Sequence, residues 1–178
     1  MFRATLVALL TAVYPLLVYF GLGTFEPRWL ALLLAGVALL RAIGSPDRFW
    51  WWAAGAALGL AGLTVLANDA LPLKLYPVLV NSVLLIVFGA SLVHPPSAIE
   101  RLARLREPDL DLRGVAYTRR VTQLWCAFFV VNGGIALATS LWASDAVWAL
   151  YNGLIAYLLI GTLMGGEWLF RQRVRSRA

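Results

Sequence analysis

Hydrophobic residues run in six long stretches along the chain, separated by short polar connections and one long polar interruption. A helix needs roughly 20 apolar residues to cross the ~30 Å hydrocarbon core of a bilayer, and stretches close to this length recur throughout the sequence. The pattern predicts an all-α integral membrane bundle of six transmembrane helices, in a single domain over residues 1–178. The expected spans are residues 4–22, 29–43, 49–67, 75–93, 121–141 and 146–166.

Two of these spans need a specific argument. Residues 29–43 form the shortest stretch, and it crosses the membrane only if the Arg41 side chain extends to the membrane surface. The first stretch follows Met1-Phe2-Arg3, as in a secretory signal peptide, but it continues to Leu22 without an A-x-A cleavage site. We therefore expect an uncleaved first span.

The long polar interruption covers residues 94–120. Pro95-Pro96 ends the preceding helix, because proline lacks an amide hydrogen and disfavours helical geometry in the residue before it. Ser97 and Glu100 form a capping box, which predicts a new helix that lies in the lipid headgroup layer. A connecting helix docked on the bundle is the alternative. The candidate headgroup contacts are Arg101, Arg104 and Arg106.

Basic residues are divided unevenly between the two sides that six spans create. Thirteen of the fifteen lysines and arginines fall on the side that holds both termini and residues 94–120, and only Arg28 and Lys74 fall on the other. Cytoplasmic segments of membrane proteins are enriched in lysine and arginine. The distribution predicts an N-in/C-in topology with a cytoplasmic 94–120 segment.

Composition agrees with a membrane protein. The chain is 61% hydrophobic and 13% charged, and its mean hydropathy is +0.78. A soluble domain of 178 residues cannot bury so much apolar surface. The net charge of +6 would suggest nucleic acid in a soluble protein, but these arginines flank apolar spans, so we expect membrane lipids and no nucleic acid as partners. The single Cys126 excludes an internal disulfide and a cysteine-based metal cluster.

Small residues indicate where helices approach each other closely. Gly55 and Gly59 in the third span, and Gly161 and Gly165 in the sixth, both form the G-x-x-x-G motif of packed membrane helices. We expect the third span to be central in the bundle. The motifs alone also allow a homodimer, which we hold as a minor alternative.

Within the spans, the polar side chains that stand out are amides. The sequence shows no paired carboxylates for acid–base catalysis, no metal-ligand spacing and no phosphate-binding loop, so we predict no catalytic residue, no metal and no cofactor. Asn81, Asn132 and Asn152 form a candidate polar cluster in the outer halves of three sequential spans. They either hydrogen-bond across helices, which we favour, or line a polar cavity.

Several local patterns resemble the intracellular septation protein A family. They are Gly62-Leu63-Thr64, Asn68-Asp69, Lys74, the P-x-x-I-E-R pattern at residues 96–101, Trp125-x-Ala127-Phe128-Phe129 with Gly133, and Trp148. The chain is similar, more closely still, to a sister group of predicted bacterial membrane proteins encoded among ketosynthase and aryl-polyene genes. It departs from the family in His94-Pro95-Pro96 and in its longer arginine-rich loop.

This resemblance implies a non-enzymatic protein of the bacterial inner membrane that assists cell-envelope or lipid-linked product assembly, with other envelope-assembly proteins as partners. The second hypothesis is a small transporter or flippase for a lipid-linked intermediate that uses the three asparagines. An integral-membrane enzyme is the third. A cavity that opens to lipid or water and is lined by the asparagines favours transport, whereas a closed bundle favours the assisting role.

Overall fold

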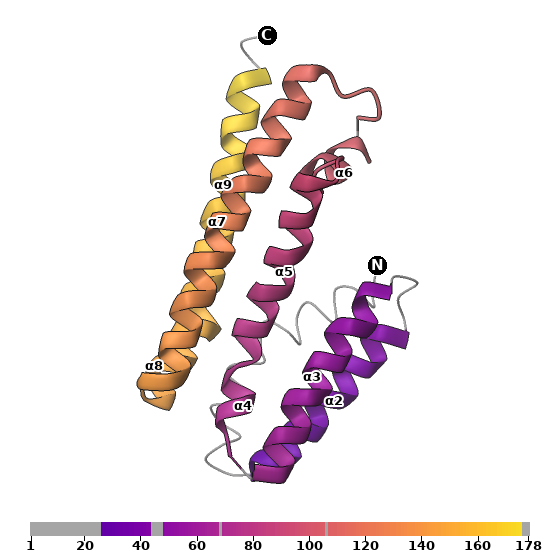
Figure 1. Ribbon diagram of the computed structural model, residues 1–178. Helices are drawn as coiled ribbons and strands as arrows, with labels where there is room; N and C mark the ends of the chain where they lie inside the picture. Colours follow the sequence, from indigo (N-terminus) through magenta and orange to yellow (C-terminus); the bar gives the residue numbers. More distant parts are fainter. Residues whose placement is uncertain (1–25, 44–47, 68, 106, 176–178) are drawn as a thin grey trace.

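The computed structural model describes residues 26–43, 48–67, 69–105 and 107–175. All the regular secondary structure in these residues is helical, which confirms the all-α prediction. The helices, labelled in Figure 1, are α2 (Pro27–Ile43), α3 (Arg48–Ala67), α4 (Leu71–Lys74), α5 (Tyr76–Val93), α6 (Ala98–Arg104), α7 (Leu112–Trp142), α8 (Asp145–Leu150), the π-helical turn η1 (Tyr151–Ile155) and α9 (Ala156–Arg175).

Three long rods lie side by side in the molecule: α5, α7, and the continuous helix made by α8, η1 and α9 (Figure 1). The short helices α4 and α8 lie at one end, and α6 lies at the other end with the last turns of α9. Helices α2 and α3 pack against each other as a hairpin and meet the three rods mainly through α4 and α5.

Three stretches of the described chain are long and apolar enough to cross a membrane: Leu71–Val93, Leu112–Trp142 and Asp145–Glu167. They contain the predicted fourth, fifth and sixth spans. Helices α2 and α3 form where the second and third spans were predicted, and Ala54–Ala67 is a shorter apolar stretch. The predicted first span lies outside the described residues.

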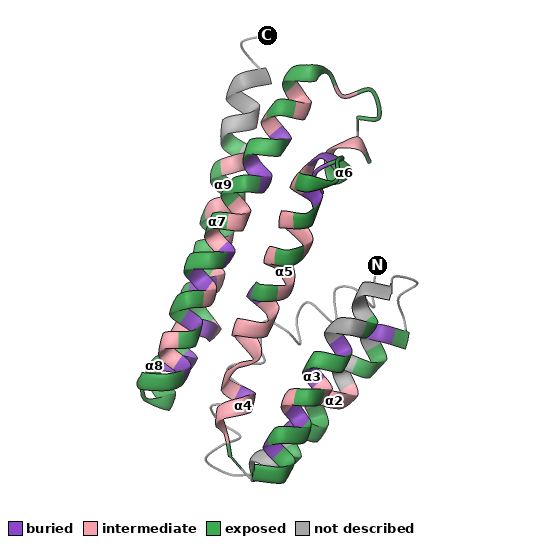
Figure 2. Cartoon of the chain, in the orientation of Figure 1, coloured by how far each residue is buried: buried purple, intermediate pink, exposed green. Residues whose placement is uncertain are grey.

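Most of the buried side chains are alanines or polar groups, whereas many large aliphatic side chains are exposed. Figure 2 marks the buried and exposed positions along the helices. Large aliphatic side chains such as Leu66 (86% exposed) and Leu40 (73% exposed) face outward, whereas water-soluble proteins bury such residues in a core. Interfaces between membrane helices instead contain small and hydrogen-bonding side chains. The polar side chains buried within the helices include Thr64, Asn81, Ser91, Thr122, Asn132, Ser140 and Asn152.

Three hydrogen bonds set the antiparallel register of α7 against α5 and the preceding α4. At one end the Ser140 hydroxyl donates to the Lys74 carbonyl (2.8 Å), and at the other the Arg119 guanidinium donates to the Leu92 carbonyl (3.0 Å). Between them, Asn132 Nδ2 donates to Asn81 Oδ1 (3.0 Å). Phe88 and Phe129 pack edge to face in the same interface, with ring centroids 5.2 Å apart.

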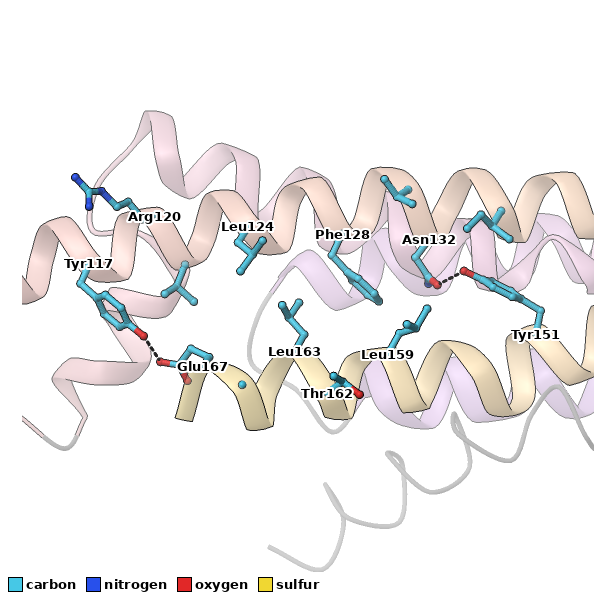
Figure 3. Close-up of a pocket in the computed structure, with 14 residues that line it drawn as sticks. Tyr117, Arg120, Leu124, Phe128, Asn132, Tyr151, Leu159, Thr162, Leu163 and Glu167 are labelled. Carbon is cyan, nitrogen blue, oxygen red and sulfur yellow. Dashed lines mark hydrogen bonds between the residues drawn. The ribbon is translucent and has the colours of Figure 1, made fainter. Parts of the chain in front are cut away.

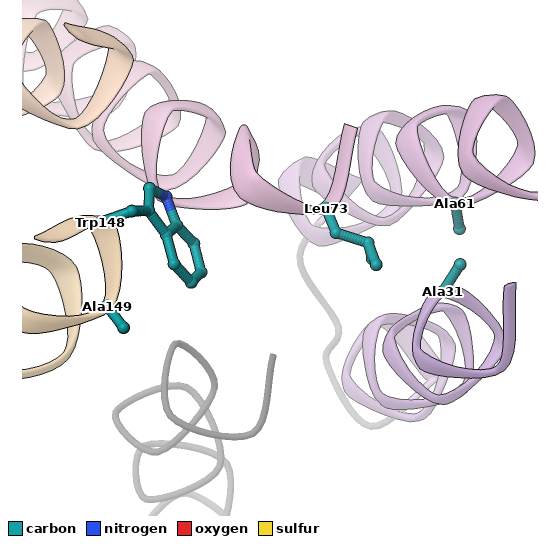
Figure 4. Close-up of a cluster of buried hydrophobic side chains, with 5 residues drawn as sticks. All are labelled: Ala31, Ala61, Leu73, Trp148 and Ala149. Carbon is teal, nitrogen blue, oxygen red and sulfur yellow. The ribbon is translucent and has the colours of Figure 1, made fainter. Parts of the chain in front are cut away.

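A small buried cluster joins the hairpin to the rods near α4 and α8 (Figure 4). Trp148 is fully buried there, and its Nε1 donates to the Lys74 carbonyl (3.1 Å). The Lys74 ammonium forms an ion pair with Asp145, which ties α4 to the first turn of α8. The apolar members of the cluster are Ala31, Ala61, Leu73, Trp148 and Ala149.

Helix α7 begins well before the span that the sequence predicted. It begins at Leu112 rather than at Val121, because the carboxylate of Asp111 accepts a hydrogen bond from the Gly114 amide (2.7 Å) and caps the helix there. The predicted 94–120 loop therefore holds α6 and the first turns of α7. The prediction followed the change in polarity at Val121 and did not use the capping residue Asp111.

The glycine motifs do not make the predicted helix contacts within the described residues. A Cβ added at Gly55, Gly59, Gly161 or Gly165 would meet no other atom within 4 Å. Helix α3 packs mainly against α2, with three alanines buried in their place, so the expected central position of the third span is not observed among the described helices. These alanines are Ala54, Ala57 and Ala61.

Candidate functional site

Asn81 and Asn132, two of the three predicted asparagines, meet in the α5–α7 interface. Both side chains are buried, and the Nδ2 of Asn132 donates to the Oδ1 of Asn81. The Oδ1 of Asn132 in turn accepts a hydrogen bond from the Tyr151 hydroxyl at 2.9 Å. The Nδ2 of Asn81 donates to the Pro77 carbonyl, one turn earlier in the same helix (2.8 Å). The chain Asn81–Asn132–Tyr151 thus connects three helical segments.

Gly133 permits this close contact. A Cβ at residue 133 would lie 3.1 Å from the Asn81 Cβ, whereas a Cβ at Gly134 would meet nothing within 4 Å. The Asn81 Cβ is fixed to the α5 backbone and cannot move aside as the end of a long side chain would. The helices therefore approach each other at residue 133 because that residue is a glycine.

Asn152, the third predicted asparagine, makes a separate set of contacts. It is also buried, but its Nδ2 donates to the Thr139 hydroxyl (3.2 Å) and to the Trp148 carbonyl (2.9 Å). Thr139 is seven residues from Asn132, about 10 Å along α7 at ~1.5 Å per residue. The structure thus brings Asn81 and Asn132 together and leaves Asn152 in a second polar layer.

Tyr151 and Asn152 both belong to the π-helical turn η1. A π turn inserts an extra residue into a helix, and such turns are frequent at functional sites. In η1 the two neighbouring side chains donate to different levels of α7, Tyr151 to Asn132 and Asn152 to Thr139. The turn therefore fixes how α8 and α9 lie against α7.

A groove of about 760 Å³ opens between α7 and α9 (Figure 3). Its volume falls within the range of ~300–1,000 Å³ that is typical of small-molecule sites. Apolar side chains line its middle, with Leu124 and Phe128 from α7 and Leu159 and Leu163 from α9. The two helices approach each other closely only near α8 and η1, which leaves this space open along the side of the molecule.

Polar side chains lie at both ends of the groove. At one end is the hydrogen bond between Asn132 and Tyr151; at the other, the Tyr117 hydroxyl donates to Glu167 Oε1 at 3.3 Å (Figure 3). Arg120 lies at this second end and is exposed. The groove is therefore apolar along its middle, and at each end a hydrogen bond joins α7 to the η1–α9 rod.

Asn81 lines a second, smaller hollow of about 220 Å³ next to Gly133 and Phe129. Asn132 lines the large groove and Asn81 the small hollow, so the hydrogen bond between these two side chains lies between the two spaces. Two of the three predicted asparagines thus border hollows on the surface.

Helix α6 is held against the rods by side chains that cap its first amides. The Ser91 hydroxyl accepts from the Ala98 amide (2.8 Å), and the Thr122 hydroxyl accepts from the Ile99 amide (3.3 Å). Glu100 Oε2 accepts from the Ser97 amide (3.3 Å), which supplies one half of the predicted capping box. The Ser97 hydroxyl is buried and makes no well-formed hydrogen bond among the described residues.

Two of the three predicted headgroup arginines make contacts within the protein. Arg104 pairs with Glu100 (2.9 Å) and donates to the Pro108 carbonyl (2.9 Å), and Arg101 donates to the Pro96 carbonyl (3.0 Å). Arg106 lies outside the described residues. These contacts favour the docked connecting helix that we considered as the alternative. The Arg101 side chain is exposed, which leaves it free to reach lipid headgroups. That contact stays a prediction.

Sequence reasoning missed the groove and the residues at its second end. Tyr117 fell in the predicted 94–120 loop, and Glu167 lies directly after the predicted sixth span. A signal was present: groove-lining residues recur every three or four positions along α7, as expected for one face of a helix. They are Tyr117, Arg120, Val121, Leu124, Phe128, Val131, Asn132 and Ile135.

Within the part of the chain that the structure describes, no group of three histidine, cysteine, aspartate or glutamate side chains is arranged to hold a metal ion. Comparison with known proteins gives no match to a family model, a curated protein or a solved structure. The resemblance to septation protein A therefore stays a prediction.

Proposed function

We propose that the protein is a six-span protein of the bacterial inner membrane that assists cell-envelope or lipid-linked product assembly by binding a lipid-like molecule in the α7–α9 groove. The observation that carries this proposal is the groove itself, which opens between two helices long enough to cross a membrane. Asn132 alone of the three asparagines lines it, so it is not the cavity lined by all three that a transporter would use. An apolar groove open to the side of a membrane helix pair is accessible to molecules dissolved in the bilayer.

The basic residues support the orientation. With six spans, thirteen of the fifteen lysines and arginines lie on one side, which is the cytoplasmic side by the usual enrichment. In this orientation both termini, α6 and the Arg120 end of the groove are cytoplasmic. The Asn132–Tyr151 end then lies near the middle of the bilayer.

Purification tests this function directly. The protein extracted in mild detergent should retain a lipid or lipid-linked species, identified by mass spectrometry. Leu163→Trp, which fills the middle of the groove, should lose that species and fail to complement a deletion strain at normal protein abundance. Leu158→Trp is the matched control, because Leu158 is exposed on α9 without lining the groove. Equal retention and complementation by both variants would contradict the proposal.

A lipid transporter or flippase is the second candidate, and the position of Asn132 favours it. Its amide lies at the end of the apolar groove that is nearer the middle of the bilayer. A headgroup in transit would need a hydrogen-bond partner there. Transfer of a fluorescent lipid between leaflets of proteoliposomes distinguishes the two candidates. Transfer that Asn132→Leu abolishes favours the flippase, and binding without transfer favours the assisting role.

A further inference from the structure

We propose that the groove holds one acyl chain of an anionic lipid from the cytoplasmic leaflet, with the charged headgroup at Arg120 and the end of the chain at Asn132 and Tyr151. This inference rests on the proposed function, since it names the chemistry and the orientation of the molecule in the same groove. Three observations support it: the length of the groove, its polarity and the charge at its Arg120 end.

The distance along α7 from Arg120 to Asn132 matches one leaflet. Arg120 and Asn132 are twelve residues apart on α7, which is about 18 Å at ~1.5 Å per residue. Half of the ~30 Å hydrocarbon core is about 15 Å. A chain that begins at Arg120 therefore reaches the level of Asn132 near the bilayer midplane, and the groove lining continues one turn further to Ile135.

The polarity of the groove fits one chain and excludes a headgroup from the middle. Between the two ends, the wall is almost entirely aliphatic and aromatic, with Leu124, Phe128, Leu159 and Leu163 facing the space. Thr162 is the exception, and its hydroxyl donates a hydrogen bond to the Leu158 carbonyl (2.7 Å). The two hydrogen bonds at residues 117 and 132 limit the width, because each connects α7 to the opposite rod.

One basic side chain, Arg120, lines this end of the groove together with the acidic Glu167. Arg113, Arg119 and Arg120 lie in the first turns of α7, which contain no acidic residue. Glu167 is the one acidic residue that lines this end, and its carboxylate accepts a hydrogen bond from the Tyr117 hydroxyl. Arginine binds phosphate oxygens with paired, charge-assisted hydrogen bonds, and its long side chain can follow a headgroup at the membrane surface.

Lysophospholipids with one chain and two different headgroups test the inference on the purified full-length protein. The probes are lysophosphatidylglycerol, which is anionic, and lysophosphatidylcholine of the same chain length, which is zwitterionic. Binding is measured by native mass spectrometry, and thermal stability is recorded for every variant. The wild-type protein should bind the anionic probe at least tenfold more tightly. Arg120→Gln should remove this preference, whereas Arg113→Gln, on the same helix but not in the groove, should keep it.

The groove variants separate the two proposals. If Leu163→Trp blocks both probes but wild-type protein binds them equally, the headgroup inference is wrong and the groove remains a lipid site. If Leu163→Trp binds both probes as wild type does, or wild type binds neither, both proposals are wrong. A wild-type dimer that Leu163→Trp dissociates would show that a second copy fills the groove, which also overturns the inference.

Discussion

Gly133 has a specific steric role that its neighbour Gly134 does not share. A Cβ at 133 would press on the Asn81 Cβ at 3.1 Å, and relieving that contact requires α5 and α7 to separate. We expect Gly133→Ala to destabilise the protein by about 1 kcal/mol, the lower end for overpacked interfaces. Gly134→Ala should be neutral or slightly stabilising, because alanine favours the helix. Thermal unfolding in detergent compares the two, and equal melting temperatures would contradict this account.

Asn132 should matter more than the other two asparagines, because it makes two bonds to different helical segments. Hydrogen bonds between membrane helices contribute about 0.6 kcal/mol each, so Asn132→Leu should cost roughly twice as much as Asn81→Leu or Asn152→Leu. Tyr151→Phe should lower the melting temperature of the wild-type protein. It should have almost no effect in Asn132→Leu, whose leucine offers no acceptor. Full additivity of Tyr151→Phe and Asn132→Leu would exclude the bond.

At the scale of single residues, the sequence indicated the amides and their approximate depth but not their partners. Asn81 and Asn132 meet because α5 and α7 are antiparallel and adjacent. Asn152 was expected with them, and the η1 turn directs it to Thr139 instead. A π turn has no sequence signature that hydrophobic periodicity detects, so this difference required the structure.

Helix α6 is too short to be stable alone, and side chains of the neighbouring helices hold it in place. A helix of seven residues is marginal alone, and Ser91 and Thr122 accept the amides of Ala98 and Ile99 at its first turn. We expect Ser91→Ala with Thr122→Val to speed hydrogen exchange across residues 97–104 at least tenfold.

The matched control for this experiment is Thr162→Val. Thr162 bonds only the carbonyl four residues before it, as Thr122 also does with Thr118, but it contacts no amide of α6. Exchange in residues 97–104 should therefore be unchanged in Thr162→Val. Slow exchange in the double variant would show that packing against α7, rather than the two hydroxyls, holds α6.

The helical elements were largely predictable, and their ends were less so. Long apolar stretches predicted α5, α7 and the α8–η1–α9 rod, because a membrane requires continuous helix. The early beginning of α7 at Asp111 and the break between α4 and α5 near Pro77 follow from local capping and from a missing amide. Both features occur where polarity changes little, so hydropathy alone does not mark them.

The whole molecule has an orientation that a topology experiment can test. In a Cys126→Ala background, a single cysteine near Ala178 should be labelled only from the cytoplasm, and one at Ser144 only from the periplasm. The reason is the excess of arginine on the side that holds the termini. A periplasmic Ala178 would refute the six-span arrangement, and labelling of Ser144 from the cytoplasm would refute the orientation of α7.

The direction of the hydrogen bonds between α5 and α7 has a consequence for biosynthesis. All three register bonds run from donors on α7 to acceptors on α4 and α5: Lys74 O, Asn81 Oδ1 and Leu92 O. The ribosome makes α5 first, so these acceptors enter the bilayer before their donors exist. A nascent chain that stops before residue 112 therefore lacks the donor for Asn81 Oδ1, the acceptor within the span, and synthesis through Ser140 completes the set.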